Sequence, residues 1–345
     1  MSARRRLLPT ARALCAALAM AITVAAGGAA IAADSAVILQ YHRFGEDKYP
    51  STSVTIAQLE AHIAHLASGG YSVLPVPDIL AAIDAGEPLP DRTIGITIDD
   101  ATRSTFVEAW PRFEAAGFPF TVFVSTDAVD QGHAGIMSWD ELRQLAAAGV
   151  TIANHSAAHG YMWREDEATN RADLLRAQRR IEEELGVEAT LFAYPFGEWD
   201  EALRSLVADL GFAAAFGQHS GVVAAHTDRL NLPRFALNRS YGEMDRFRLI
   251  VDTLPLGARD VTPADQIMQE NPPAVGFTIE PPLANPASLA CYASGGVTAA
   301  LEHEEGGRVA VGFDKPFPRG RARLNCTAPA GGGRWHWFGL QLVAP

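Results

Sequence analysis

The feature that most constrains the fold is a regular alternation of short apolar strands and amphipathic helices, which runs from about residue 36 to residue 253. The stretch TIGITI (93–98) is rich in β-branched residues, whereas VTIAQLEAHIAHLASGG (54–70) places apolar residues at helical spacing. Such alternation indicates an α/β fold with a mainly parallel sheet. About seven strands of this kind predict a (β/α) barrel. No glycine-rich phosphate-binding motif follows the first strand, which argues against a nucleotide-binding sheet.

The N-terminal residues 1–33 have a different character. Three arginines, Arg4 to Arg6, precede an apolar run from about residue 13 to residue 26, and small residues follow at Ala30 and Ala32. This pattern is typical of a secretory signal peptide and is too short for a comfortable membrane span. We therefore predict export to the periplasm or the extracellular space, with no transmembrane helix in the mature chain.

The C-terminal part of the sequence predicts a second structural unit. It begins with proline-rich segments and continues with short stretches in which apolar and polar residues alternate. We therefore expect a barrel over residues 34–256 and a small β-sandwich-like module over residues 257–345. Cys291 and Cys326 both fall in this module. In an exported protein such a pair is expected to form a disulfide, the alternative being two separate buried thiols.

The charge of the chain limits its partners. The formal net charge is -12 at pH 7. Nucleic-acid binding depends on basic patches that contact phosphates, so we expect no nucleic-acid partner. An acidic protein can still act on an uncharged polymer. The sequence leaves the oligomeric state open.

Ionisable residues gather where the predicted strands end, which is the edge that carries the active site of a parallel barrel. Asp99 and Asp100 end the strand TIGITI, and His155 and His159 follow the strand VTIAN. The other candidate residues at or near strand ends are His42, Tyr194, Phe196, His219 and Arg234. Several strand ends therefore direct chemically active groups to one edge of the sheet.

The adjacent carboxylates Asp99 and Asp100 repel each other, so their placement needs a reason. Two histidines spaced as His155 and His159 share one face of a helical turn, and two imidazoles with one carboxylate are a common zinc set. A cation bound by Asp100 and the two histidines would relieve the repulsion and leave Asp99 free as a general base. Alone, the histidines have a simpler reading as a core or surface pair, and Asp100 as a helix cap. Their combination at strand ends favours the metal site.

These motifs resemble those of the polysaccharide deacetylase family, carbohydrate esterase family four, over about residues 36–240. TIDD (97–100) and HSAAH (155–159) match the first two family motifs, and AYPFG (193–197) is similar to the third. ILQYHRF (38–44) resembles the poly-N-acetylglucosamine deacetylase branch, in which the motif order is permuted. The resemblance implies a distorted (β/α) barrel, a divalent metal and removal of N-acetyl groups from a glycan.

The chain departs from the family pattern at two positions near the base. Ala101 stands where the family has glycine, and Ala193 stands where it has an arginine that partners the base. Arg234 is placed to supply that charge from another strand. Tyr194 and Phe196 follow the third motif, so we expect them near the substrate, with a backbone N–H near Phe196 stabilising the oxyanion.

The general acid of the family is also missing. The late leucine–histidine motif is absent, since LPRFALN (232–238) holds no histidine. Amide hydrolysis needs a proton on the leaving nitrogen, so another strand end has to supply it. We expect His42 to do so, with His219 as the second choice; the simpler alternative is that His42 only packs under the barrel rim.

The sequence thus predicts a metal-dependent hydrolase that removes N-acetyl groups from an N-acetylglucosamine-containing polysaccharide of the cell envelope. Zinc is the expected ion, with cobalt, nickel and manganese as alternatives. Two other functions stay open: a metal-dependent amidase or esterase for a smaller substrate, and a non-catalytic glycan-binding protein. A base beside a metal set favours an enzyme, because binding alone does not need one.

Overall fold

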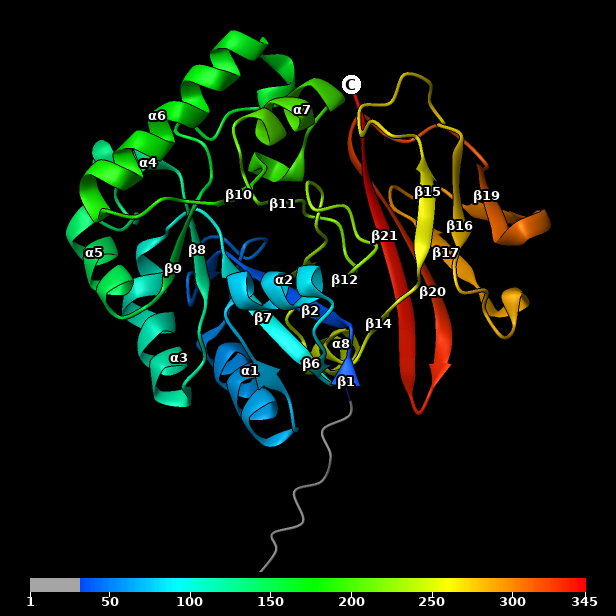
Figure 1. Ribbon diagram of the computed structural model, residues 1–345, viewed down its shortest axis with the longest axis horizontal. Coiled ribbons are helices and arrows are strands. Elements are labelled where there is room, and N and C mark those ends of the chain that lie inside the picture. Colours follow the sequence, from blue (N-terminus) through cyan, green and yellow to red (C-terminus); the bar gives the residue numbers. More distant parts are fainter. Residues whose placement is uncertain (1–31) are drawn as a thin grey trace, which may run out of the picture. The chain divides into compact units, whose positions relative to one another are not determined.

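Figure 1 shows the computed structural model of the chain, of which residues 32–345 are described here. The expected signal peptide, residues 1–33, lies outside the described residues except for Ala32–Ala33. These two residues form β1, which pairs with β6 (Leu89–Pro90). In the described part of the chain, no helix is both long and apolar enough to cross a membrane.

A curled sheet of mostly parallel strands forms the centre of the first region (Figure 1). In spatial order its strands are β11 (Ala214–Phe216), β10 (Leu191–Ala193), β9 (Thr151–Asn154), β8 (Thr121–Val124), β7 (Thr93–Ile98), β2 (Ser35–Tyr41) and β12 (Val222–Ala224). The short strands β5 (Ser72–Val73) and β13 (Phe235–Ala236) pair with β7 and β2. Strand β12 runs antiparallel to β2, while the other pairs of this sheet are parallel. The predicted distorted (β/α) barrel is confirmed.

Helices cover the sheet, and the resulting burial of its strands accounts for their apolar sequences. The helices are α1 (Ile56–Ser68), α2 (Val76–Ala85), α3 (Trp110–Ala116), α4 (Thr126–Asp130), α5 (Trp139–Ala147), α6 (Glu167–Leu185), α7 (Glu201–Asp209) and α8 (Met244–Val251). Figure 1 shows α3, α5 and α6 on the outer side of β8 and β9. Strands β2, β7 and β8 are buried along their whole length, as expected for parallel strands covered on both faces. A polar residue inside such a strand therefore needs a partner.

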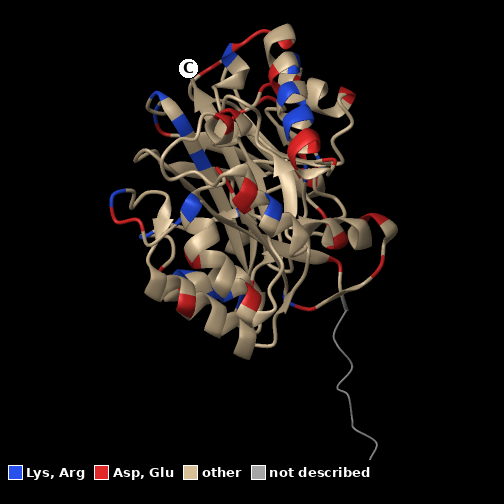
Figure 2. Cartoon of the chain, turned by 90° about the vertical axis from the view of Figure 1, so that its left-hand side faces the viewer, with Lys and Arg blue, Asp and Glu red and all other residues tan. Residues whose placement is uncertain are grey.

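Helix starts and surface ion pairs secure the outer layer. Thr55 and Gln58 form a reciprocal capping box that begins α1. Arg176 of α6 pairs with Asp127 of α4 at 3.0 Å. Figure 2 shows acidic and basic residues interspersed over the helices that it presents. Exposed ion pairs of this kind contribute only about 0–1 kcal/mol each to the free energy of unfolding, so they do not determine the fold.

The C-terminal module consists of two four-stranded sheets. The first contains β14 (Leu254–Pro255), β21 (Arg334–Ala344), β20 (Gly320–Gly331) and β17 (Ala290–Ala293). The second contains β15 (Ala258–Thr262), β16 (Val275–Ile279), β19 (Arg308–Phe313) and β18 (Ala299–His303). Buried residues such as Phe277 and Leu324 give this module its own hydrophobic core. Strand β14 lies just before the boundary expected at residue 257, and it already belongs to this module.

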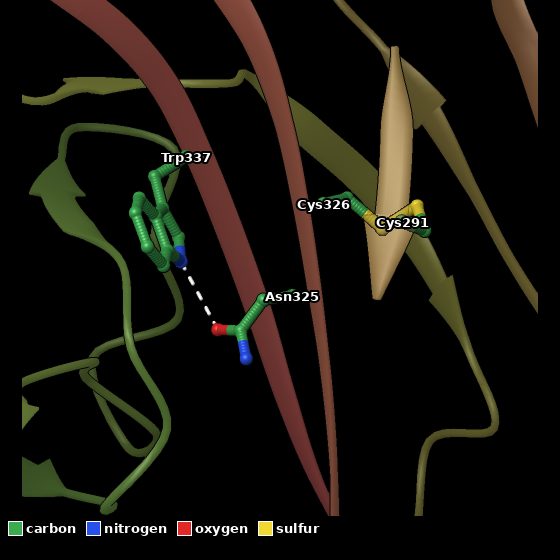
Figure 3. The surroundings of a disulfide bond; sticks show 4 residues. All are labelled: Cys291, Asn325, Cys326 and Trp337. Atoms are coloured by element: carbon green, nitrogen blue, oxygen red, sulfur yellow. Dashed lines mark hydrogen bonds between the residues drawn. A yellow bond between two sulfur atoms is a disulfide. The ribbon is translucent and has the colours of Figure 1, made fainter. Parts of the chain in front are cut away.

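A disulfide joins two strands of the first of these sheets. Cys291 on β17 lies directly opposite Cys326 on β20, and the two form the expected bond (Figure 3). Cys326 is fully buried in the module core. The neighbouring Asn325 points to the other face of the strand, as the pleat requires, and accepts a hydrogen bond from the indole N–H of Trp337 at 3.0 Å. The bond therefore joins β17 to β20 on the face that packs into the module core, and the opposite face of β20 is free for other contacts.

We expect the C291A/C326A double variant to be less stable than the wild type. The bridge closes a separation of 35 residues, and the loss of such a constraint destabilises by about 3–4 kcal/mol. Thermal unfolding followed by circular dichroism, with and without dithiothreitol, measures the effect. The reductant should lower the wild-type Tm to that of the variant and leave the variant unchanged. Equal stability of oxidised wild type and variant would contradict the prediction.

Candidate active site

Asp100, His155 and His159 converge at the carboxyl ends of β7 and β9. Their ligand atoms all lie within 4.8 Å of one another. Asp100 Oδ1 is 3.5 Å from His155 Nε2 and 3.3 Å from His159 Nε2. The structure thus brings together the three residues expected to bind metal, and this donor set suits a divalent cation such as zinc.

The surroundings of His155 fit a cation as well. Its side chain is fully buried, its Nδ1 lies 2.7 Å from the carbonyl oxygen of Ala193, and its Nε2 has no hydrogen-bond partner among the described residues. A carbonyl can only accept, so Nδ1 carries a proton, and in the neutral form of the ring Nε2 offers its lone pair toward Asp100. Two electron-rich groups that face each other in a buried place favour a cation between them. The residues present therefore fit a divalent metal.

The segment that carries the two histidines is a loop, so the prediction of a helical turn was wrong. Ser156 and His159 have φ angles of 63° and 52°. Asn154 Oδ1 accepts the backbone N–H of Ser156 at 2.8 Å, and Ser156 Oγ accepts the backbone N–H of His159 at 2.9 Å. Short polar side chains stabilise turns in this way in competition with helix formation. The histidines converge through these turns and not through helical periodicity.

Unusual backbone conformations concentrate around Asp100, His155 and His159, the three expected metal ligands (the metal set). The described part of the chain contains seven non-glycine residues with positive φ. Five of them lie in this site, namely Asp100, Ala101, Ser156, His159 and Phe196. Each such residue costs about 1–3 kcal/mol and persists only where its surroundings hold it, which is common at functional sites. The φ of 50° at Ala101 explains the family's glycine there, since glycine adopts this conformation without strain.

Asp99 is fully buried beside the metal set and is held by an arginine and an amide. Arg234 donates from Nη1 to Oδ1 at 2.7 Å and from Nη2 to Oδ2 at 2.9 Å. Gln40 donates from Nε2 to Oδ2 at 2.7 Å. Arg234 is also fully buried and donates from Nε to the carbonyl of Gly217 at 3.0 Å. Ala193 cannot pair with Asp99 as the family's arginine does. In this structure Arg234, from another part of the chain, makes that pair with the expected base.

The sequence interpretation missed Gln40. The signal was present, because an amide in the middle of the apolar strand AVILQY has to find a partner once the strand is buried on both faces. A search for polar residues inside fully apolar strands would have indicated it. Thr97, in β7, is a second residue of this kind, and its Oγ1 accepts from Arg234 Nη1 at 3.2 Å.

Both carboxylates are ionised at neutral pH. Burial by itself raises the pKa of Asp99, but Arg234, His155 and His42 outweigh it and hold this pKa at about 2. Burial also raises the pKa of Asp100, but the neighbouring His155 and His159 outweigh it and keep this pKa well below its ordinary value. The two neighbouring carboxylates therefore face different partners: Asp99 faces the guanidinium of Arg234, and Asp100 faces the two imidazoles.

His42 lies next to the buried Asp99. Its Nε2 is 3.8 Å from Asp99 Oδ2, and its side chain is 14% exposed. Thr102 Oγ1 donates to the backbone carbonyl of His42 at 2.7 Å and fixes the end of the strand. Burial lowers the pKa of His42, so the ring is neutral at rest at pH 7. The structure thus brings the expected acid next to the expected base.

Phe196 lies at the outer side of the metal set. Its ring packs edge-on against His159 with 4.7 Å between ring centroids, and it stacks on Tyr161 at 4.3 Å. Tyr161 is 44% exposed. An exposed aromatic face next to the metal set is a surface on which a sugar ring can stack. The sequence interpretation did not single out Tyr161.

The structure places Tyr194 and His219 away from the cluster. Tyr194 is fully buried, and its hydroxyl donates to the carbonyl of Leu230 at 3.0 Å. Burial of His219 and the charge of Arg234 lower the pKa of the His219 ring to about 4. The ring lines a cavity of about 460 Å³ together with Trp199. Neither side chain joins the carboxylate pair, because strand ends that are adjacent in a sheet still direct alternate side chains to opposite faces.

Comparisons with known proteins agree with this geometry. Residues 86–215 match the family model described as "Polysaccharide deacetylase". Over these residues the chain is similar to polysaccharide deacetylases. This similarity supports a hydrolase that acts on carbon–nitrogen bonds other than peptide bonds.

Two curated relatives are similar to part of this chain. A Bacillus subtilis (strain 168) protein, YxkH, whose name assigns it to the polysaccharide deacetylases, is 20% identical over 201 residues, or 56% of this chain and 71% of that protein. The "Poly-beta-1,6-N-acetyl-D-glucosamine N-deacetylase" of Escherichia coli (strain K12) is 22% identical over 214 residues. That match covers 50% of this chain but only 32% of the Escherichia coli enzyme.

A solved structure shares the fold over part of this chain. The deacetylase PplD of Streptococcus pyogenes, determined in complex with acetate, superposes with a TM-score of 0.59 at 16% identity. The superposition covers 63% of this chain and 98% of PplD.

We expect the His155→Ala variant to lose its bound metal. The wild type purified with zinc should hold about one ion per chain, as a set of three protein ligands does. The variant should hold far less, because alanine offers no metal-binding atom in place of the imidazole. Inductively coupled plasma mass spectrometry measures the content. His133→Ala is the control, since His133 is exposed and should not alter it. Stoichiometric metal in His155→Ala would exclude His155 from the site.

Proposed function

We propose that the protein is an exported, metal-dependent deacetylase that removes N-acetyl groups from an N-acetylglucosamine-containing glycan of the cell envelope. The observation that carries this proposal is a buried, ionised Asp99, paired with Arg234, beside a set of metal ligands. The names of the Escherichia coli and Streptococcus pyogenes proteins support the substrate class and the acetate product. The expected signal peptide supports export.

Asp100, His155 and His159 would hold the cation, with zinc as the first choice over cobalt, nickel and manganese. A divalent cation in such a site polarises the acetyl carbonyl and lowers the pKa of water. The side chain of His155 is kept in the required tautomer by the carbonyl of Ala193. These three residues therefore define where the acetyl group lies relative to the base.

Asp99 acts as the general base. Arg234 and Gln40 hold its carboxylate in one orientation and keep it ionised, so it is ready to accept a proton from the attacking water. A base with so low a pKa holds the accepted proton only briefly. The proton has a nearby destination, because His42 Nε2 is 3.8 Å from Asp99 Oδ2.

His42 delivers this proton to the leaving nitrogen. The resting ring is neutral, so it has to gain a proton from Asp99 before it can donate one. The water oxygen forms the new bond to the acetyl carbon, and the carbon–nitrogen bond breaks as His42 protonates the amine. The products are acetate and a glucosamine unit, and both catalytic side chains return to their starting states.

We propose that the backbone N–H of Phe196 donates a hydrogen bond to the oxyanion. This N–H belongs to the strained turn that follows β10, next to His159. A backbone donor that is fixed before the reaction stabilises the developing negative charge without reorganisation. Of the other residues predicted near the substrate, Tyr194 takes part through its position in this turn, since its side chain is buried.

We expect the protein to release acetate from N-acetylated glycans. A panel of chitooligosaccharides, peptidoglycan and poly-N-acetylglucosamine, assayed with and without chelator, tests this. Asp99→Asn should keep the metal and lose turnover by about 100-fold or more, because the base is gone. Metal-dependent acetate release from small amides alone would favour the smaller-substrate alternative. Loss of metal in Asp99→Asn would make Asp99 a ligand and reverse the assignment of the pair.

We expect His42→Ala to separate amides from activated esters. The variant should keep its metal and fold but lose amide turnover by about 100-fold or more, since the amine leaves only when protonated. An activated acetate ester, whose leaving group needs no proton, should be hydrolysed at nearly the wild-type rate. Parallel kinetics on both substrates measure the difference. Equal losses on amide and ester, or no loss, would remove His42 from the acid role.

A further inference from the structure

The two histidines of the metal set are oriented by different means. His155 is fixed by a hydrogen bond from Nδ1 to the carbonyl of Ala193 at 2.7 Å. Among the described residues, the ring of His159 has Asp100 as its only polar partner, and its other close neighbour outside the set is the ring of Phe196 at 4.7 Å. Metal-binding histidines usually need a second contact to fix the ring. The orientation of His159 therefore depends on where Phe196 lies.

Phe196 lies in a conformation that its own sequence does not favour. Its φ of 60° and ψ of 2° are in the left-handed region, which is strained for a phenylalanine. Its carbonyl accepts a hydrogen bond from Gln341 Nε2 at 3.1 Å, and the carbonyl of Gly197 accepts one from the same atom at 2.8 Å. Gln341 belongs to β21 of the C-terminal module and is buried. The module thus contributes to holding this strained turn.

The two residues after this turn are also held by the module. Glu198 is buried, and its Oε1 lies 3.6 Å from Arg321 Nε. The backbone N–H of Trp199 donates to Gln266 Oε1 at 3.3 Å. Each residue from Phe196 to Trp199 therefore has a polar contact with a side chain of the module.

A cavity lies beside the segment 196–199, so its position depends more strongly on hydrogen bonds than on packing. The cavity of about 460 Å³ is lined by Trp199, Gln266 and Gln341, among others. Where a cavity adjoins a segment, close packing does not fix it on that side, and it can relax into the space. Within the barrel, Trp163 donates to the side chain of Glu198, and the indole of Trp199 donates to Asn231. The carbonyls of Phe196 and Gly197 are instead held from the module, so its hydrogen bonds contribute to the position of residues 196–199.

We propose that the C-terminal module positions the active-site segment Phe196–Trp199 and, through Phe196, the ring of His159, with Gln341 as the principal positioning residue. This inference rests on the proposed role of His159 as a metal ligand. Gln341 does not touch the substrate or the metal set. It acts through the turn that it holds, which makes the module a part of the catalytic unit and not an independent appendage.

The same strand offers a matched control at its other end. Arg334 of β21 donates from Nε to the carbonyl of Asp252 at 2.8 Å and pairs with Asp91 at 2.9 Å. These contacts also join the module to the barrel, but they do not involve residues 196–199. A loss of general cohesion would therefore affect Arg334→Ala and a Gln341 variant alike, whereas a loss of positioning would affect only the latter.

The experiment compares Gln341→Met, which keeps side-chain length but removes the donor, with Arg334→Ala in the full chain. Zinc affinity is measured by competition with a chromophoric chelator, and backbone exchange over residues 196–199 by hydrogen–deuterium exchange mass spectrometry. We expect Gln341→Met to weaken zinc binding by about 10-fold or more and to speed exchange in this segment. Arg334→Ala should leave both at wild-type values. Arg321→Ala, at an exposed position, should shift both in the same direction by less.

Equal effects of Gln341→Met and Arg334→Ala, or unchanged zinc affinity and exchange in Gln341→Met, would overturn the proposal. If Gln341→Met fails to fold, Arg321→Ala decides it by the same two measurements against the same control. The outcome is separable from that of the proposed function. A wild type that binds zinc but releases no acetate would refute the deacetylase and still allow the positioning to be tested. In a wild type without zinc, the exchange comparison alone would decide.

Discussion

The ion pair between Asp99 and Arg234 is the interaction on which the rest of the site depends. Both side chains are fully buried, and removing two charges from water costs several kcal/mol unless the geometry and the remaining hydrogen bonds compensate. Here the pair is bidentate, and Gln40 and Gly217 make further hydrogen bonds to it. Among the described residues, neither Asp99 nor Arg234 has a buried side-chain polar atom without a partner. Asp99 follows a central strand of the sheet and Gly217 follows its edge strand β11. Arg234 therefore ties the centre of the incomplete barrel to its edge at the level of the active site.

This pair also explains how two neighbouring aspartates serve different purposes. Arg234 compensates Asp99, so Asp99 stays ionised without binding a metal. Asp100 has no arginine and faces His155 and His159, so its charge is directed at the position that a cation would occupy. The chain turns directly after Asp99, with left-handed φ angles at Asp100 and Ala101. The two carboxylates on either side of this turn have different partners, as the two proposed roles require.

Much of this site could be predicted because strand ends of a parallel sheet share one edge, which is how Asp99, Asp100, His155 and His42 were found. Arg234 was found from the missing partner at Ala193. The conformation of the loop that carries His155 and His159 was not predictable from their spacing. The side chains of Asn154 and Ser156 accept backbone N–H groups there and stabilise turns in place of a helix. Tyr194 and His219 show that position at a strand end does not tell which way a side chain points. Gln341 lies 145 residues from Phe196, and no local pattern connects them.

The alternation of β21 shows why one strand can serve both the module and the barrel. Phe338, Leu340 and Leu342 pack into the module core. The opposite face presents Trp337 to Phe235, Gly339 to the backbone of Ser220, and Gln341 to the turn at Phe196. A side chain at position 339 would place its Cβ 2.2 Å from the carbonyl oxygen of Ser220, so only glycine lets the strand approach this closely. Gln341 is two residues away on the same face, and its reach to the turn depends on that approach. The absence of a side chain at Gly339 is therefore a condition for the geometry of the active site.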